Sequence, residues 1–256
     1  MSIPKIIHYC WFGGKPKPEL AEKCIRSWKK FCPEYEIIEW NEGNFQIASA
    51  PLYVRQAYEA GRWAFVTDYV RLRAMTEMGG IYMDTDVELV KPLDPYLQHE
   101  AFAGFEHPER IQTGLLACRK DFLLFRDFLG YYDTASFYRP DGTQDITTNV
   151  EVLTRLCMER GLVPNDKYQV VDGFAIYPRE IFCPVDYDTE KLHRTRKTVA
   201  IHWFASSWHT EEELEELRQE KLRQKQEKMS NLRYGIGTKL FGEKGYEKLK
   251  SVLLKK

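Results

Sequence analysis

Four charged side chains suited to binding a metal ion or a phosphate lie close together in the sequence: Asp68, Arg71, Asp84 and Asp86. Asp68 and Arg71 are three residues apart in a helix-like stretch, so they would share one helix face. Asp84 and Asp86 follow an apolar strand, and in an extended chain their side chains would point the same way. Carboxylates after a buried strand lie where open α/β sheets bind ligands. Their hard oxygen atoms would suit Mg²⁺ or Mn²⁺ carrying a diphosphate.

Each half of this group also has an ordinary interpretation. An aspartate pair with one residue between occurs again at Asp186 and Asp188, without an apolar strand and a glycine pair before it. Such a pair alone is usually a solvated turn. Asp68 and Arg71 alone would be a helix ion pair worth a few tenths of a kcal/mol. The complete string from Ala64 to Asp86, with Gly79 and Gly80 before the strand, is the more specific signal.

The elements expected around these residues alternate in the manner of an α/β protein. Hydrophobic spacing and Gly or Pro breaks predict helices over 18–30, 51–60, 63–78, 122–129 and 147–160. Short apolar runs predict strands over 5–12, 35–40, 81–83, 87–90, 101–105, 114–118 and 199–203. The strand–helix–strand start favours a parallel unit. We therefore expect one α/β domain over 1–209 and a basic, helical C-terminal extension over 210–256.

Composition limits the class of protein. The chain has 256 residues, of which 43% are hydrophobic and 29% are charged, as in ordinary soluble domains. No apolar run reaches the roughly 18 residues of a membrane-spanning helix, and the N-terminus lacks a signal-peptide pattern. The six cysteines form no C-x-x-C pair, so we expect free thiols in a reducing compartment. These features predict a cytoplasmic location.

The C-terminal segment differs from the rest in charge. Residues 217–256 carry twelve Lys or Arg and four Glu, a net charge of +8, whereas residues 1–216 carry −9. An apolar stripe of Tyr246, Leu249, Val252 and Leu253 runs through the last stretch. Such a basic amphipathic segment can lie on a membrane, here the inner face of the cell membrane. The alternative is that the stripe packs on the protein's own core or on a second subunit. Nucleic acid is disfavoured, because the segment lacks interleaved aromatic residues.

Three separate motifs resemble those of one enzyme family. The string from Ala64 to Asp86 resembles the sugar-binding D-x-D region of family 32 glycosyltransferases, which include bacterial capsular-polysaccharide and fungal initiating mannosyltransferases. The opening from Ile3 to Gly14 resembles the first strand of this family and of the clostridial glucosylating toxins. The string from Ala200 to Trp208 resembles the family's C-terminal motif. The resemblance implies a GT-A fold, which is a Rossmann-like sheet that binds a nucleotide sugar, and a retaining, Mn²⁺- or Mg²⁺-dependent transfer.

The resemblance also implies a role for each matched residue. Asp86 would ligate the metal ion directly, His202 would be a second ligand, and Asp84 would lie near the ribose and the sugar. Asp68 and Arg71 would hold the sugar hydroxyls and the phosphate side. The nucleotide and its diphosphate would contact four residues: Trp11, Tyr82, Ser206 and Trp208. A core role remains the alternative for Trp11 and His202. His8, and Trp40 with Asn41, could touch the nucleotide, but internal hydrogen bonding is at least as good an interpretation.

Two other classes of function remain open at this stage. A hydrolase or phosphotransferase could use the same carboxylates and metal ion, and it would turn substrate over without an acceptor. A nucleotide-sugar-binding protein without catalysis would keep the fold, although the intact charged residues argue against it. The expected donor is a UDP-linked sugar, and the expected acceptor is a saccharide or a lipid-linked oligosaccharide of surface polysaccharide synthesis.

Overall fold

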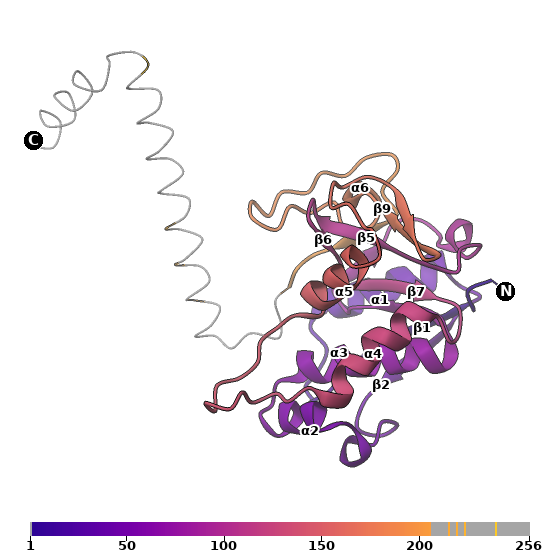
Figure 1. The fold of residues 1–256 in the computed structure, drawn as a ribbon. Helices are drawn as coiled ribbons and strands as arrows, with labels where there is room; N and C mark the ends of the chain where they lie inside the picture. The colour runs from indigo at the N-terminus through magenta and orange to yellow at the C-terminus, as the bar shows by residue number, and fades with distance from the viewer. Residues whose placement is uncertain (1, 206–214, 216–218, 220–222, 224–238, 240–256) are drawn as a thin grey trace, which may run out of the picture. The chain divides into compact units, whose positions relative to one another are not determined.

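A computed structural model describes residues 2–205 together with 215, 219, 223 and 239, and Figure 1 shows its ribbon. The strands are β1 (Ile6–Cys10), β2 (Glu36–Trp40), β3 (Gly80–Met83), β4 (Val87–Leu89), β5 (Ala101–His107), β6 (Arg110–Ile111), β7 (Leu115–Cys118), β8 (Gln169–Val171), β9 (Phe174–Tyr177) and β10 (Ala200–His202). The helices are α1 (Glu19–Phe31), α2 (Leu52–Glu59), α3 (Trp63–Met78), α4 (Leu123–Thr134), α5 (Asn149–Met158) and α6 (Arg179–Phe182), with 3₁₀ turns at Ile47–Ser49 and Asp94–Tyr96.

The main sheet has the strand order β2-β1-β3-β7-β5-β9-β8, with β6 paired to β5. Strand β1 is parallel to both β2 and β3, and β5 is parallel to β9. Strand β7 runs antiparallel to β3 and β5 and so separates the two parallel groups. The α/β class predicted from the sequence is confirmed, and its parallel unit β2-β1-β3 has the Rossmann-like arrangement expected of a GT-A fold.

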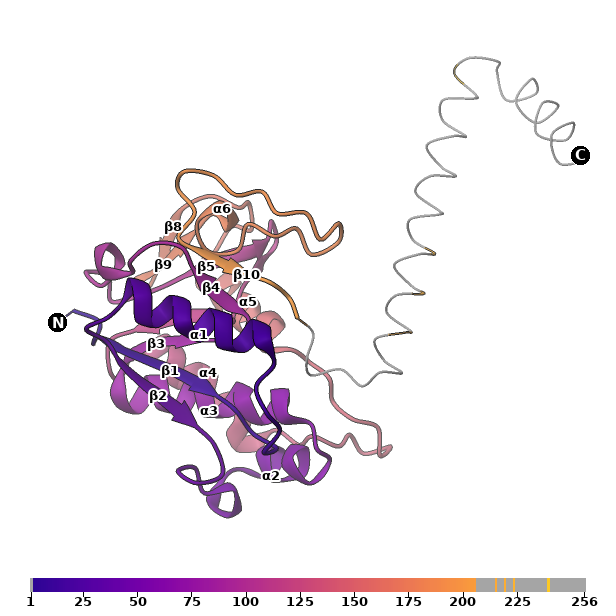
Figure 2. The ribbon, with the colours of Figure 1, turned by 180° about the vertical axis from the view of Figure 1, so that it is seen from behind.

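Two apolar cores cover the two faces of this sheet. Alternate residues of β1 divide between them, because successive side chains of a strand point to opposite faces. Ile7 and Tyr9 pack with α1 on one face, while Cys10 packs with α2, α3 and α4 on the other. Figure 1 shows α3 and α4 in front of the sheet, and Figure 2 shows α1 in front from the opposite side. The sheet edge between these layers is therefore the place where the strand ends can form a site.

Strands β4 and β10 form a small antiparallel sheet of their own. Helix α1 holds β4 through two side chains: the Trp28 indole donates a hydrogen bond to the Val87 carbonyl (2.7 Å), and the Ser27 hydroxyl accepts one from the Leu89 amide (2.8 Å). The strands predicted over 87–90 and 199–203 therefore exist, but they pair with each other and not within the main sheet.

The hairpin of β8 and β9 was not predicted from the sequence. Its turn is Asp172-Gly173, and both residues have positive φ angles of 47° and 82°. A turn with two such residues matches the right-handed twist of paired strands, which is why Asp-Gly is a strong hairpin signal. Strand β8 has only three residues, which is too short a run to give a clear alternating pattern.

Three further predictions concern the cysteines, membrane-spanning helices and the boundary of the C-terminal extension. All six cysteines are buried and free, as predicted. Among the described residues, no helix has both the length and the apolar character needed to cross a bilayer. Internal contacts divide the chain into Met1–Ala205 and Ser206–Lys256. The expected helical extension over 210–256 falls almost entirely outside the described residues, so the predicted boundary after residue 209 stays a prediction.

Candidate metal and donor site

Asp84 and Asp86 lie in a turn between β3 and β4. The Val87 amide donates a hydrogen bond to the Asp84 carbonyl (2.9 Å), so this segment is not extended, contrary to the expectation from the sequence. The turn is anchored to the segment just before β7, since the Asp84 amide donates a hydrogen bond to the Gly114 carbonyl (2.8 Å). The two carboxylates still converge, but the turn brings them together and strand alternation does not.

The register of β10 against β4 brings His202 to these carboxylates. His202 pairs with Val87, the residue after Asp86. Its Nε2 lies 3.4 Å from Asp86 Oδ1, and the Trp203 and Ala205 amides donate to the carbonyl and the Oδ2 of Asp86 at 3.0 and 2.8 Å. One ligand atom from each of Asp84, Asp86 and His202 lies within 4.8 Å of the others. The metal ligands predicted from the sequence, Asp86 and His202, are thus neighbours, and Asp84 joins them.

His202 and Asp86 shift each other's pKa values. Burial alone would lower the pKa of His202, but Asp86 and Cys183 raise that pKa well above its ordinary value. Burial alone would raise the pKa of Asp86, but His202 and the Ala205 amide lower it. The shifts of the two pKa values thus favour the protonated imidazole beside the ionised Asp86 carboxylate. A site whose carboxylates are balanced by an exchangeable proton is suited to exchange that proton for a divalent cation.

The donor set and the space around it fit a Mg²⁺ or Mn²⁺ ion. Two carboxylates suit both ions, and an imidazole also suits Mn²⁺. A Cβ atom on Gly114 would lie 2.7 Å from His202 Cε1 and 3.1 Å from Asp84 Oδ2. The position beside the ligands therefore requires glycine. Among the described residues, no hydrogen-bond partner reaches the buried Nδ1 of His202.

Arg71 and Asp68 form the layer next to Asp84. The Arg71 guanidinium lies 3.0 Å from Asp68 Oδ1 and 3.4 Å from Asp84 Oδ1, and it donates to the Thr113 carbonyl (2.7 Å). Its side chain is only 5% exposed, so these partners are what make burial of its charge tolerable. Burial raises the pKa of Asp68 to about 6 in spite of Arg71. The predicted pair on one helix face is confirmed, and it also fixes Asp84.

Tyr82 completes this layer. Its hydroxyl donates to Asp84 Oδ1 (2.8 Å), and its ring lies under the Arg71 guanidinium, whose Cζ is 4.5 Å from the ring centre. The ring is 1% exposed. Tyr82 therefore positions Asp84 and Arg71 in the structure, and its predicted contact with the nucleotide stays a prediction.

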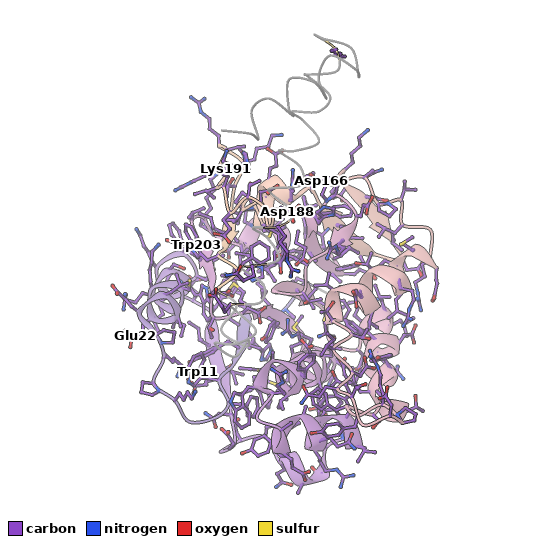
Figure 3. The ribbon with its side chains drawn as sticks, turned by 90° about the vertical axis from the view of Figure 1, so that its left-hand side faces the viewer. Trp11, Glu22, Asp166, Asp188, Lys191 and Trp203 are labelled. Atoms are coloured by element: carbon purple, nitrogen blue, oxygen red, sulfur yellow. The ribbon has the colours of Figure 1, made fainter. Side chains whose placement is uncertain are left out.

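Trp11 lies on the side of the molecule that faces the viewer in Figure 3. It is half-buried, its indole N–H donates to the Lys15 carbonyl (2.6 Å), and the Lys17 ammonium lies 5.6 Å from its ring centre. The ring is thus neither a core residue nor free on all sides, and one face carries a cation. This arrangement leaves base stacking by Trp11 as a prediction.

His8 has an internal role. It is fully buried, its Nε2 lies 2.8 Å from the Gly79 carbonyl, and its Nδ1 accepts a hydrogen bond from the Trp40 indole (3.2 Å). Both ring nitrogens are satisfied when Nε2 carries the proton, so His8 and Trp40 stabilise the fold. Asn41 caps its own turn through the Gly43 amide (2.8 Å).

Two further interpretations from the sequence concern the C-terminal motif and the second aspartate pair. Ser206 and Trp208 lie outside the described residues, so their predicted contacts with the diphosphate stay predictions. The second aspartate pair is structural: Asp186 accepts hydrogen bonds from the amide and hydroxyl of Thr189 (2.8 and 2.7 Å), and Asp188 is exposed. Sequence reasoning missed Thr113 and Gly114, which contact the charged residues. Their signal would have been a Thr-Gly pair before a strand next to β3.

Comparisons by sequence find one matching family model and one similar protein. Residues 18–103 match the model of a glycosyltransferase sugar-binding region containing a DXD motif. The chain is 30% identical over 127 residues to inositol phosphoceramide mannosyltransferase 3 of Schizosaccharomyces pombe, covering 46% of this chain and 34% of that protein. The chain thus spans about a third of that relative's length.

Two solved structures show lower similarity. The PaToxG glycosyltransferase aligns with a TM-score of 0.49 and 19% identity over 62% of this chain and 70% of its own. The galactosyltransferase LgtC, solved with donor and acceptor sugar analogues, aligns with a TM-score of 0.41 and 13% identity. This alignment covers 80% of this chain and 90% of LgtC.

Proposed function

We propose that the chain transfers a sugar from a nucleotide sugar to a saccharide or lipid-linked acceptor, because residues 18–103 match the model of a glycosyltransferase sugar-binding region containing a DXD motif. The observation that supports this most strongly is the convergence of Asp84, Asp86 and His202 within 4.8 Å, beside a buried arginine. A hydrolase or a binding protein would share the metal ligands, so the test must include an acceptor.

Asp84, Asp86 and His202 would hold the divalent cation. When bound, this ion would neutralise negative charge on the departing diphosphate. The chain's own residues prepare the site: Arg71 fixes the carboxylates of Asp68 and Asp84, and the Trp203 and Ala205 amides fix Asp86. Preorganised charges of this kind lower the cost of reorganisation during a reaction.

We further propose a retaining transfer with a UDP-linked hexose as donor. The half-buried ring of Trp11 supports a stacked base, and the resemblance to capsular transferases supports surface polysaccharide synthesis. The similarity to a protein named as a mannosyltransferase makes GDP-mannose the second candidate donor. We also propose that the protein acts in the cytoplasm, with residues 217–256 on the inner membrane face, because of their net charge of +8.

The first experiment is a screen of UDP-hexoses and GDP-mannose with Mn²⁺ or Mg²⁺, with and without saccharide acceptors, read by release of the nucleoside diphosphate. Asp86→Ala should abolish metal-dependent turnover and leave the protein folded. Asp188→Ala, from the exposed second aspartate pair, is the matched control and should keep full activity. Full activity of a folded Asp86→Ala protein would contradict the metal assignment. Acceptor-independent turnover alone would favour the hydrolase.

A further inference from the structure

Gln112 has a buried amide group without a partner in the described part of the chain. The residue is 0% exposed, and neither Nε2 nor Oε1 makes a hydrogen bond there. A side-chain amide can make up to four hydrogen bonds. Burying it with none is costly, and an apolar side chain of similar size would avoid this cost. The fold itself therefore gives no reason for a polar group at this position.

The amide lies beside the proposed donor site. The Gln112 backbone amide donates to the Gly104 carbonyl (2.9 Å), and Nε2 lies 3.2 Å from the point where a Cβ atom on Gly104 would be. Two residues after Gln112, Gly114 contacts His202 and Asp84. The side-chain amide therefore packs closely against the β5 backbone at Gly104, two residues before the glycine that lies against two of the metal ligands.

A carboxyl group lies on the same side of the site. Glu106, two residues after Gly104 on β5, is half-buried and interacts electrostatically with His202, Arg110 and Asp84. It also influences the thiol of Cys183, which itself lies next to His202. The charge of Glu106 thus acts on two of the metal ligands, His202 and Asp84, but Glu106 is not one of the three residues whose ligand atoms converge.

We propose that Gln112 and Glu106 bind the hydroxyl groups of the sugar that is transferred and so determine which donor the site accepts. The proposal rests on the proposed function and names the residues of its sugar subsite. An amide and a carboxyl together supply both donors and acceptors, which is what a polyhydroxylated ring requires. Sites that bind a hydroxyl through buried polar groups discriminate strongly, because an analogue without that hydroxyl leaves those groups unpaired.

The test compares each nucleoside diphosphate with its nucleotide sugar. Calorimetry with Mn²⁺ gives the Kd of UDP, UDP-glucose, UDP-galactose, UDP-N-acetylglucosamine, GDP and GDP-mannose for the full chain. In Gln112→Met we expect at least a tenfold weaker affinity for the accepted nucleotide sugar, equivalent to about 1.4 kcal/mol. The affinity for the nucleoside diphosphate alone should stay the same. Glu106→Gln should show the same pattern and a changed order of preference among the sugars.

Thermal unfolding supplies a readout that does not depend on ligands. Gln112→Met should raise the Tm, because two unpaired polar atoms are replaced by an apolar chain. Thr76→Val is the matched control. Thr76 is buried, its hydroxyl has no partner within the described residues, and it lies eight residues from Asp68, about 12 Å along α3. This variant should also gain stability, but it should bind every ligand as the unmodified chain does.

The outcomes separate the two proposals. If the unmodified chain binds no nucleotide or nucleotide sugar, the proposed function fails. If it binds them, the Gln112→Met variant decides the role of Gln112. The assignment is wrong if this variant weakens the affinities for the nucleotide sugar and for the nucleoside diphosphate equally, or if it changes neither affinity. In that case the amide binds an ordered water or has a structural role. Likewise, Glu106 does not belong to the sugar subsite if Glu106→Gln leaves unchanged the ratio between the affinities for the nucleotide sugar and for the nucleoside diphosphate.

Discussion

At the scale of single residues, Gly114 provides the space for the metal ligands. A Cβ atom there would lie 2.7 Å from the His202 ring, which is too close for any side chain. Gly114→Ala should therefore push His202 away from Asp86 and weaken Mn²⁺ binding by 10- to 100-fold, a range typical of residues that orient metal ligands. Calorimetric titration with Mn²⁺ measures this change.

The control for this substitution is Gly130→Ala, on the exposed face of α4. Its new Cβ atom would meet no atom closer than Asp133 Oδ2 at 3.9 Å. This variant should keep its Mn²⁺ affinity and gain roughly 0.5–1 kcal/mol of stability, because alanine is the better helix former. Unchanged Mn²⁺ binding by a folded Gly114→Ala protein would show that the ligands do not depend on this space.

His8 links stability to pH. Burial lowers the pKa of His8, although the Gly79 carbonyl and Glu36 partly oppose that effect. In the unfolded chain the ordinary pKa is about 6.5, so below that pH the unfolded state binds more protons than the folded state. The stability contributed by neutral His8 is therefore present above about pH 6.5 and is lost as the pH falls. Urea unfolding of His8→Gln at pH 7.5 and pH 5 should show a smaller loss than the unmodified chain, and an equal loss would contradict this account.

At the scale of elements, helix α1 sets the position of the strand that follows Asp86. The Ser27 hydroxyl donates to the Cys24 carbonyl and accepts from the Leu89 amide, and both bonds are buried. Ser27→Ala would leave the Leu89 amide unpaired, so we expect a loss of about 1–3 kcal/mol in the free energy of unfolding. Denaturant titration measures the loss. Ser49→Ala, whose exposed hydroxyl donates to the Gln46 carbonyl and has no other bond within the described part of the chain, should lose much less.

The elements also show how far a single sequence leads. Helix α3 and strand β3 follow from local apolar spacing and from Gly79, and their local patterns placed Asp68 and Arg71 correctly. The pairing of β10 with β4 depends on register between distant segments, and no local pattern encodes it. The antiparallel direction of β7 is equally non-local. Gln112 could not be found at all, because an unpaired buried amide becomes visible only when its surroundings are known.

At the scale of the whole molecule, charge is divided unevenly along the chain. Residues 217–256 carry +8, and near an anionic surface each Lys or Arg adds about 1 kcal/mol of attraction. The full chain should therefore co-sediment with phosphatidylserine-containing vesicles at low salt, while a chain ending at residue 216 should stay in the supernatant. A full-length variant with Lys244, Lys248 and Lys250 changed to Glu should also stay there. Equal behaviour of all three proteins would show that this segment has no affinity for anionic lipid.

The pairing of His202 with the Asp86 turn has a consequence for biosynthesis. The hydrogen bond from the Ala205 amide to Asp86 spans 119 residues of sequence. Closing such a large loop costs chain entropy, so contacts of this kind form late in folding. A chain emerging from the ribosome carries Asp84 and Asp86 long before β10 exists, and until then it lacks one ligand of the proposed metal site. The proposed three-ligand site is therefore complete only after the chain has been made as far as Ala205.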